Sequence, residues 1–364
     1  KEAMNLSPEI MLAKILGITE KEVKEALFLI NKYKIVKRKK KSGGYRVLYI
    51  PPPALKNAQK KIHRLFVRLY WYYHWNYQGL YGIFPKTSYI DHAQMHKDSK
   101  WILQVDLKDA FPSTDIRVLE KIIYSLFIRQ IEVFEKNFNI SRELFGAELY
   151  KKLSKKLSDS ELVFYPLREY LIRRESNSLR PWVFPQKKKL AEELANLIIK
   201  LTTYQGTLPQ GTPTAPILFH LFIAEGGMLN KIISLFSPPK NCQDKYRFRV
   251  SIYVDNIVIS AQKPIPKEFR KQLFKIIKKC GFKENPNKTR HQGIRHGLPL
   301  ITGLRVGNGR VALPRRKLRQ IRGIIYRAKF NPQLKQEVEG FKAFLKPIYG
   351  DELPSQLAKL LTQQ

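Results

Sequence analysis

The sequence predicts an α+β protein, because two hairpin-forming stretches lie among long segments with helical periodicity. Residues 248–260 hold two apolar runs that flank an acidic tip, and residues 301–314 hold two more around Gly307-Asn308-Gly309. Short polar or glycine-containing tips between apolar runs are typical of tight β-hairpins. Hydrophobic residues make up 43% of the 364 residues, so the chain can bury a large core and divide into subdomains.

The N-terminal segment predicts two short helices. Apolar residues recur at helical spacing over residues 6–34, on both sides of the turn Gly17-Ile18-Thr19. Residues 12–23 also resemble a helix-turn-helix fragment, although we favour a helical cap on the domain that follows. A basic run over residues 37–44 then ends in a flexible turn at its two glycines.

Strands and helices alternate through the rest of the chain. Residues 45–50 are strand-like and stop at three prolines, since proline cannot donate to a β-ladder. A second apolar strand over residues 101–107 brings the chain to Asp106. A break at residues 206–216 precedes an apolar helix. The predicted helical stretches are 54–75, 115–205, 217–236, 266–280 and the basic region from Arg315 onward.

The charge balance points to a polyanionic partner. Lys and Arg total 67 and Asp and Glu total 30, which gives a net charge of +37. This excess favours nucleic acid, because cationic side chains release the counterions condensed on phosphates. A membrane surface or a ribosome would also attract such a charge, but neither requires the motifs described below.

Composition also bears on the compartment. No stretch is long and apolar enough to span a membrane, and the N-terminal residues lack the apolar core of a signal peptide. The two cysteines, Cys242 and Cys280, are too few for a disulfide framework or a zinc cluster. We therefore expect a cytoplasmic protein, without a membrane partner, in which both cysteines are ordinary, partly buried thiols.

Two acidic positions stand out because each follows a strand-like run. Asp106 opens the segment DLKDAFPS, so its side chain projects toward solvent or a metal rather than into the core. The tip Tyr253-Val254-Asp255-Asn256 reads, on its own, equally well as a polar hairpin turn. If their strands are neighbours, Asp106 and Asp255 would hold a pair of Mg²⁺ ions for in-line nucleotidyl transfer.

Four segments, in this order, resemble motifs A to D of reverse transcriptases: DLKDAF (106–111), LPQGTPTAP (208–216), YVDN (253–256) and GFKENPNKTR (281–290). Within that family the chain most resembles the retron type of bacteria. The retron-like segments are residues 33–62, a basic glycine turn with a strand and prolines; residues 82–96, similar to the NAxxH region but with His92 in place of Asn; and Ile301-Thr302-Gly303, similar to the VTG triplet.

The resemblance implies a right-hand polymerase fold. Residues 1–100 would form N-terminal helices and fingers, residues 101–300 a palm with an antiparallel sheet, and residues 301–364 a primer-side hairpin and a small helical thumb. The interval between motifs A and B is longer than the family's usual spacing. Its basic surplus, at about residues 130–200, would be an insertion that grips structured RNA or a partner protein, or a solvated helical elaboration.

The resemblance also implies roles for individual residues. Asp106 and Asp255 would bind two Mg²⁺ ions, with Mn²⁺ as a substitute and the backbone carbonyl of Leu107 assisting, and Asn256 stands at the second acidic position of the catalytic box. The implied nucleotide-binding residues are Arg46, which would touch the triphosphate, Asp109, Ala110, Phe111, Gln210, Gly211 and Lys288. The implied nucleic-acid contacts are His96, Tyr253, Thr302 and Gly303.

Several of these roles have plain structural alternatives. Phe111 would be a steric gate against a ribose 2′-hydroxyl, or an ordinary core phenylalanine. Lys288 would contact triphosphate or protonate pyrophosphate, or be a solvated surface lysine. The His96 element is either structural or RNA-facing, and we assign no metal to it. Thr302 and Gly303 would lie on the primer side, or simply end a hairpin.

By resemblance, the protein would be an RNA-directed DNA polymerase. It would extend a 2′-hydroxyl of its own structured non-coding RNA with dNTPs, leave a branched RNA–DNA hybrid (msDNA), and act in anti-phage defence beside an effector protein. One rival is a related defence or abortive-infection polymerase with template-independent or protein-primed synthesis. A second rival is a non-catalytic RNA-binding scaffold.

Asn256 is the departure that affects catalysis most. Asparagine is nearly the same shape as aspartate but neutral, so it binds a hard divalent cation more weakly. Its presence should slow the chemical step while leaving the fold and the nucleotide pocket intact. Three explanations stay open at this point: an introduced inactivating change, a natural variant of low activity, or a paralogue that binds without polymerising.

Overall fold

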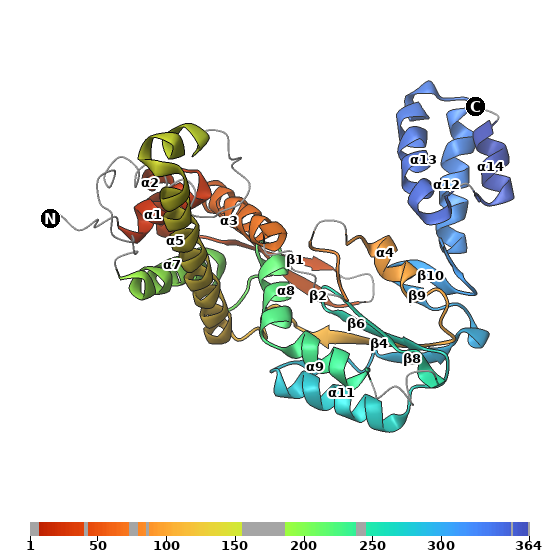
Figure 1. Cartoon of the computed structure of the whole chain (residues 1–364). Coiled ribbons are helices and arrows are strands. Elements are labelled where there is room, and N and C mark those ends of the chain that lie inside the picture. The colour runs from red at the N-terminus through yellow and green to blue at the C-terminus, as the bar shows by residue number, and fades with distance from the viewer. Residues whose placement is uncertain are drawn as a thin grey trace. The chain divides into compact units, whose positions relative to one another are not determined.

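The computed structural model describes residues 7–39, 43–72, 79–84, 87–154, 186–237, 245–350 and 352–362. These residues form a mixed α+β structure of helices with antiparallel and mixed sheets (Figure 1). The chain divides into two compact units, each built from two separate segments: Lys1–Tyr77 with Asp109–Leu229, and Gln78–Lys108 with Asn230–Gln364. The predicted boundaries of fingers, palm and thumb describe polymerase subdomains rather than these compact units, and they stay predictions.

The first unit is largely helical, and its N-terminus has the two predicted short helices. Gly17, in the left-handed conformation at φ 65°, ends α1, and Thr19 begins α2 with a capping box that it shares with Glu22. The described helices of this unit are α1 (Pro8–Leu16), α2 (Glu20–Phe28), α3 (Pro53–Tyr72), α5 (Ile116–Ser154), α7 (Lys187–Thr202) and α8 (Ala215–Glu225).

The start of the basic run, up to Lys39, is part of a β-ribbon that the sequence pattern did not reveal. Strand β1 (Lys34–Lys39) pairs antiparallel with β2 (Tyr45–Ile50), so the predicted strand has a partner. Only two residues of β1, Ile35 and Val36, are apolar, and a run of lysine and arginine gives no strand alternation. The register places Arg38 directly opposite Arg46.

The predicted insertion at about residues 130–200 is described only at its ends. Helix α5 continues to Ser154 and α7 begins at Lys187, which agrees with the predicted helical character. Residues 155–185 lie outside the described residues. Of the two cysteines, Cys280 is a free, partly buried thiol, and Cys242 lies outside the described residues.

The predicted single helix at 217–236 is wrong in one respect, because it is two helices. Gly226 and Gly227 end α8, with Gly227 at φ 83°, and α9 (Met228–Leu235) follows. Helix α8 is buried along nearly its whole length. Within the described ranges no single helix is long and apolar enough to cross a membrane, and only α8 and α9 taken together, with a bend between them, reach that length.

The second unit is built around a mixed sheet with the strand order β3-β5-β6-β4-β7, to which β8 adds by pairing with β4. All neighbouring strands are antiparallel except β3 and β5. Helix α11 (Lys267–Lys279) runs along the sheet, as predicted for residues 266–280 (Figure 1). The strands are β3 (Leu80–Tyr81), β4 (Trp101–Lys108), β5 (Arg249–Tyr253), β6 (Asn256–Ala261), β7 (Lys283–Glu284) and β8 (Arg290–Gly293).

One face of this sheet shares a hydrophobic core with the C-terminal elements. Ile102 of β4 and Val258 of β6 pack in one buried cluster with Ala93 of helix α4 (Tyr89–Gln94) and Ile301 of β9. The same cluster continues into the C-terminal helices. The elements concerned are β9 (Leu300–Ile301), β10 (Leu304–Gly307), β11 (Arg310–Ala312), α12 (Arg315–Ala328), α13 (Lys335–Tyr349) and α14 (Ser355–Thr362).

The second predicted hairpin and the basic helical C-terminus are confirmed. Strands β10 and β11 close on Asn308 and Gly309, whose φ angles of 55° and 75° both lie in the left-handed region. Two successive positive φ angles define the type I′ turn that joins tightly paired strands, and Asn-Gly is its preferred sequence.

Candidate functional site

The acidic tip is a two-residue hairpin turn, as predicted. Tyr253 at the end of β5 pairs with Asn256 at the start of β6, which leaves Val254 and Asp255 as the turn. Val254 has φ 56°, which is a genuine outlier for a β-branched side chain. Backbone strain of this kind persists only where the surrounding structure holds it, and such positions cluster at functional sites.

Strand β4 places Asp106 beside this turn. Asp106 lies directly opposite Asn256 in the antiparallel β4–β6 register, and the backbone N–H of Leu107 donates to the carbonyl of Asp255 at 2.9 Å. Opposed residues of an antiparallel pair project from the same face of the sheet. The motif A and motif C segments are therefore adjacent, which the two-carboxylate hypothesis required. Strand β4 continues to Lys108, so Asp106 lies within the strand rather than at its end.

The carboxylate of Asp106 is held by the turn that follows β7. The ammonium Nζ of Lys288 lies 3.1 Å from Oδ1 and 3.0 Å from Oδ2 of Asp106. The side-chain amide of Asn285 adds a longer contact of 3.4 Å to Oδ2, and its backbone N–H donates to the Asp106 carbonyl at 2.8 Å. The Asp106 side chain is only 16% exposed. Sequence reasoning named Lys288 but missed Asn285, which lies in the same motif D segment.

The donor atoms at this site fit a divalent cation that prefers oxygen. The side-chain oxygen of Asn256 is buried and accepts no hydrogen bond from the described residues, so it is a polar atom without a partner. Mg²⁺ is commonly bound through one or two carboxylates together with substrate phosphates. Asp106, Asp255 and the Asn256 amide oxygen match that pattern. Among the described residues no cluster of three or more His, Cys, Asp or Glu is placed to hold a metal ion.

Tyr253 lies in a slot formed by His92 and Gly82. The His92 ring stacks on the Tyr253 ring, with centroids 5.4 Å apart and an interplanar angle of 30°. A Cβ at Gly82 would come within 2.4 Å of the Tyr253 ring. Burial raises the pKa of the Tyr253 phenol and lowers the pKa of His92 to about 3. The HAxxH spacing of α4 was the available signal for this contact, but only the fold shows the stacking.

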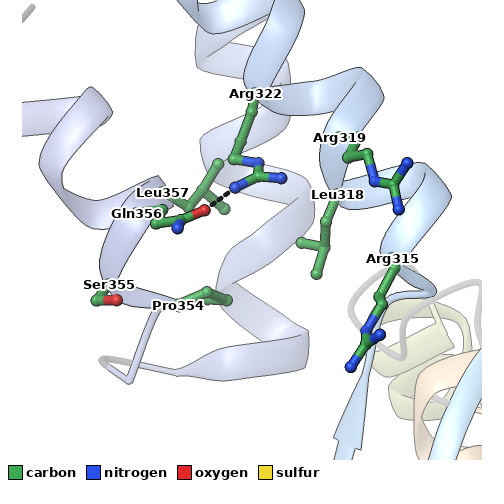
Figure 2. A pocket seen from close by; sticks show the side chains of 8 residues that line it. All are labelled: Arg315, Leu318, Arg319, Arg322, Pro354, Ser355, Gln356 and Leu357. Atoms are coloured by element: carbon green, nitrogen blue, oxygen red, sulfur yellow. Dashed lines mark hydrogen bonds between the residues drawn. The ribbon is translucent and has the colours of Figure 1, made fainter.

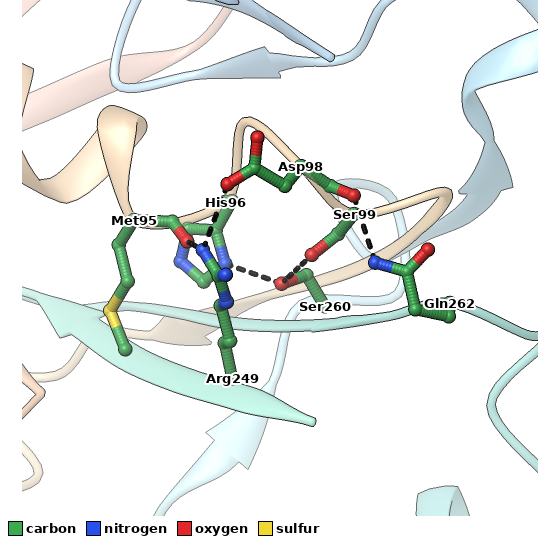
Figure 3. A network of polar contacts seen from close by, with 7 residues as sticks. All are labelled: Met95, His96, Asp98, Ser99, Arg249, Ser260 and Gln262. Atoms are coloured by element: carbon green, nitrogen blue, oxygen red, sulfur yellow. Dashed lines mark hydrogen bonds and ion pairs between the residues drawn. The ribbon is translucent and has the colours of Figure 1, made fainter. Parts of the chain in front are cut away.

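His96, two residues after α4, bonds to both strands of the β5–β6 hairpin, and Figure 3 shows its bond to Ser260. Its Nε2 lies 2.7 Å from the Ser251 hydroxyl on β5, and its Nδ1 lies 2.7 Å from the Ser260 hydroxyl on β6. Ser99 donates to Ser260 at 2.8 Å. Burial, aided by His92 and Arg249, lowers the pKa of His96 well below its usual value. This arrangement favours the structural alternative for His96 over the RNA-facing one.

A second set of contacts ties β5 to the loop after α4. The guanidinium of Arg249 donates to the carbonyl of Met95 and pairs with Asp98 at 3.6 Å. The side chain of Gln262, just beyond β6, donates to the Asp98 carbonyl at 2.8 Å. Figure 3 shows these groups surrounding the buried hydroxyls, so the loop is fixed on both strands of the hairpin.

Thr302 and Gly303 form the two-residue turn between β9 and β10. Their φ angles are 48° and 87°, and the Thr302 hydroxyl donates to the carbonyl of Tyr89 at 2.9 Å. Tyr89 is the first residue of α4. Helix α4 therefore contacts both the β5–β6 hairpin and the predicted primer-side turn, and the role of that turn in binding nucleic acid stays a prediction.

The predicted nucleotide-binding residues other than Lys288 belong to the first unit. The backbone N–H of Tyr49 on β2 donates to the carbonyl of Gln210 at 2.8 Å, so the ribbon with Arg46 lies beside the motif B loop. Gly211 has φ 102°, a conformation that favours glycine. Arg46 and Arg38 are both exposed and directly opposed on the ribbon.

Phe111 and its neighbours form the turn that follows β4. Asp109 has φ 47°, and the carbonyl of Ala110 accepts from the Thr114 hydroxyl at 3.1 Å. The Phe111 ring is buried and meets Phe219 of α8 edge to face, with centroids 5.4 Å apart. This packing fits the alternative in which Phe111 is an ordinary core phenylalanine. Its role as a steric gate stays a prediction.

The C-terminal helices carry a basic concavity of about 310 Å³ in the second unit (Figure 2). Arg315, Arg319 and Arg322 of α12 line it together with the start of α14, and Arg322 donates to the side chain of Gln356. Guanidinium groups suit phosphate oxygens because their planar N–H donors match the geometry of the anion. This surface is compatible with a polyanionic partner.

The comparison with known protein families gives no assignment, because no family model matches the chain. The resemblance to reverse transcriptases therefore rests on the motif segments and their order.

Proposed function

We propose that the protein is an RNA-directed DNA polymerase of retron type, built on a right-hand polymerase fold. The observation that supports this best is the β4–β6 register, which puts Asp106 opposite Asn256 with Asp255 in the adjoining turn. Asp106 and Asp255 would hold the metal ions. Bound Mg²⁺ would activate the primer hydroxyl and stabilise the leaving pyrophosphate.

The cationic residues of the chain supply the charge that a triphosphate needs. Arg46 lies directly opposite Arg38, and like charges so placed destabilise a ribbon unless an anion lies between them. Gln210 and Gly211 stand on the loop that accepts a hydrogen bond from the same ribbon. In this proposal the ribbon and the motif B loop bind the incoming dNTP, and Phe111 screens its sugar.

The proposed partner is a structured non-coding RNA that supplies both template and priming 2′-hydroxyl. The net charge of +37 and the arginine-lined concavity of α12 both suit a phosphate backbone. The product would be a branched RNA–DNA hybrid, made in the cytoplasm and used in anti-phage defence with an effector protein.

The first test restores the second acidic residue. We expect Asn256→Asp to raise primer extension on an RNA template with Mg²⁺ and dNTPs by roughly two orders of magnitude, since a metal ligand contributes several kcal/mol to transition-state stabilisation. Extension is measured on a gel with a labelled primer. Asp106→Ala in the same background is the control and should abolish the gain. No gain from Asn256→Asp, with extension unaffected by Asp106→Ala, would refute the two-metal site.

A non-catalytic RNA-binding scaffold is the second candidate, and the neutral Asn256 favours it. The unaltered chain decides between the two, because a scaffold does not extend a primer at any Mg²⁺ concentration. Sequencing the nucleic acid that co-purifies addresses the remaining rival. A unique DNA sequence joined to RNA supports the retron type, whereas heterogeneous or protein-linked DNA supports template-independent or protein-primed synthesis.

A further inference from the structure

We propose that Lys288 and the divalent cation compete for the carboxylate of Asp106, so that Lys288 is an internal counter-ion which the metal must displace. This inference rests on the proposed function, since it concerns the same metal site. It assigns Lys288 a role at the metal site in addition to any contact with the nucleotide.

The geometry of the pair supports competition rather than simple proximity. One ammonium nitrogen lies 3.1 Å and 3.0 Å from the two oxygens of Asp106, so both oxygens of the carboxylate are engaged by a single cation. The Asp106 side chain is 16% exposed, whereas that of Lys288 is 51% exposed. The carboxylate is therefore fixed in the site, and the lysine stem is free to move into solvent.

The backbone that carries Lys288 is anchored to the same strand. The Asn285 N–H donates to the Asp106 carbonyl at 2.8 Å, and the Asn285 carbonyl accepts from the N–H groups of Lys288 at 3.1 Å and Thr289 at 2.9 Å. The Thr289 hydroxyl adds a bond of 3.0 Å to the same carbonyl. This turn keeps Lys288 beside Asp106 at a high effective concentration even when its side chain is displaced.

The neutral Asn256 gives Lys288 more influence than it would have beside a third acid. Asp106 and Asp255 are the acidic residues of the site, and Lys288 pairs with Asp106. Electrostatic attraction for a divalent cation falls with each neutralised carboxylate. Removing the lysine should strengthen metal binding, although it deletes a group from the site.

The experiment measures Mn²⁺ binding by calorimetry, with free Mn²⁺ checked by electron paramagnetic resonance. We expect Lys288→Met to lower the Kd roughly fivefold, the factor expected when a partly exposed ion pair no longer competes. Lys288→Arg keeps the charge and should stay within about twofold of the unaltered protein. Lys283→Met is the matched control, because Lys283 is exposed on β7 and makes no ion pair with the described residues.

The same titrations are run with Asn256→Asp, so that a failure of this inference is separable from a failure of the proposed function. If Mn²⁺ binds with the same Kd with and without Lys288, or if Lys283→Met tightens binding equally, the competition is refuted and the metal site stands. If no protein in the set binds Mn²⁺, the metal site fails and the competition fails with it. Circular dichroism confirms folding, and Lys288→Gln replaces Lys288→Met if that variant is unfolded.

Discussion

At the scale of single residues, the position of Tyr253 depends on the absence of a side chain at Gly82. Gly82 has φ 94°, and the Tyr253 ring lies so close that a Cβ would approach its Cε2 to 2.4 Å. His92 stacks on the same ring. Tyr253 is thus fixed by close packing against the backbone of Gly82, one residue before the strained Val254.

Gly82→Ala tests this packing. We expect it to lower the free energy of unfolding by roughly 2–4 kcal/mol, because it adds the strain of a left-handed alanine to an overpacked contact. The measurement is urea denaturation. Gly281→Ala is the matched control, since Gly281 has φ 86° and no other group of the described residues comes within 4 Å of a Cβ placed there, so this variant should lose only the backbone part of the stability. Equal losses in the two variants would show that Tyr253 does not restrict position 82.

At the scale of elements, α4 and the two residues that follow it, Met95 and His96, organise the hairpins around them. His92 stacks on Tyr253, His96 bonds to Ser251 and Ser260, and the first carbonyl of α4 accepts from Thr302. A neutral imidazole has one donor and one acceptor nitrogen, so it satisfies two hydroxyls only if one serine donates and the other accepts. The helix is short, with six residues, and its influence comes from these contacts rather than from its length.

His96→Ala tests whether the segment that follows α4 stabilises the β5–β6 hairpin. Loss of the ring leaves the Ser251 hydroxyl buried without its partner, so we expect the free energy of unfolding to fall by roughly 2–4 kcal/mol. Hydrogen exchange of the β5 and β6 amides should accelerate together. Gln94→Ala, at the last residue of α4, removes only an exposed hydrogen bond to the Pro347 carbonyl and should change stability by less than about 0.5 kcal/mol. If the two variants behave alike, the His96 network does not hold the hairpin.

At the scale of the whole molecule, a net charge of +37 coexists with histidines that the fold keeps neutral. Burial lowers the pKa of His220 and of His92 to about 3, and it lowers that of His96 as well. Each of these residues binds a proton in the unfolded chain near pH 6.5 but not in the folded one. Their contribution to stability is complete above pH 6.5 and is lost as the pH falls toward 3.

The corresponding prediction concerns acid stability. Between pH 7.5 and pH 5, His220 alone should account for about 2 kcal/mol of lost stability, so His220→Leu should make the unfolding midpoint less dependent on pH over this range. Calorimetry at several pH values measures the effect. His296→Leu, at an exposed position, is the control for the substitution itself. An unchanged pH dependence in His220→Leu would contradict the buried neutral state.

The parts of the fold that the sequence predicted are those with a strong local signal. Asn308-Gly309 marks its turn, and Gly17 with Thr19 marks the boundary between α1 and α2. Strand β1 escaped prediction because its run of charged residues gives no alternation of apolar and polar side chains. The strand is defined by its pairing with β2. The sequence prediction missed the break between α8 and α9, because the apolar pattern is otherwise continuous and the adjacent glycines 226 and 227 are the local signal for the break.

The candidate site was predictable in its parts but not in its contacts. Motif order named Asp106, Asp255 and Asn256, and the sheet register brings their segments together. The pairing of Lys288 with Asp106 and the stacking of His92 on Tyr253 join positions far apart in the chain. No local pattern encodes such contacts, because they arise from strand order and from the approach of separate elements.

The sheet register also sets an order of events during synthesis. Residues of the first unit end at Leu229, so every residue of that unit has been synthesised before Asp255 is made. Asp106 must wait for β6 and β7, whose residues come well over a hundred positions later. Pairing over such separations is slow, because the entropy of closing a long loop opposes it. The chemistry proposed for this chain is therefore assembled last, after all residues of the helical unit have been made.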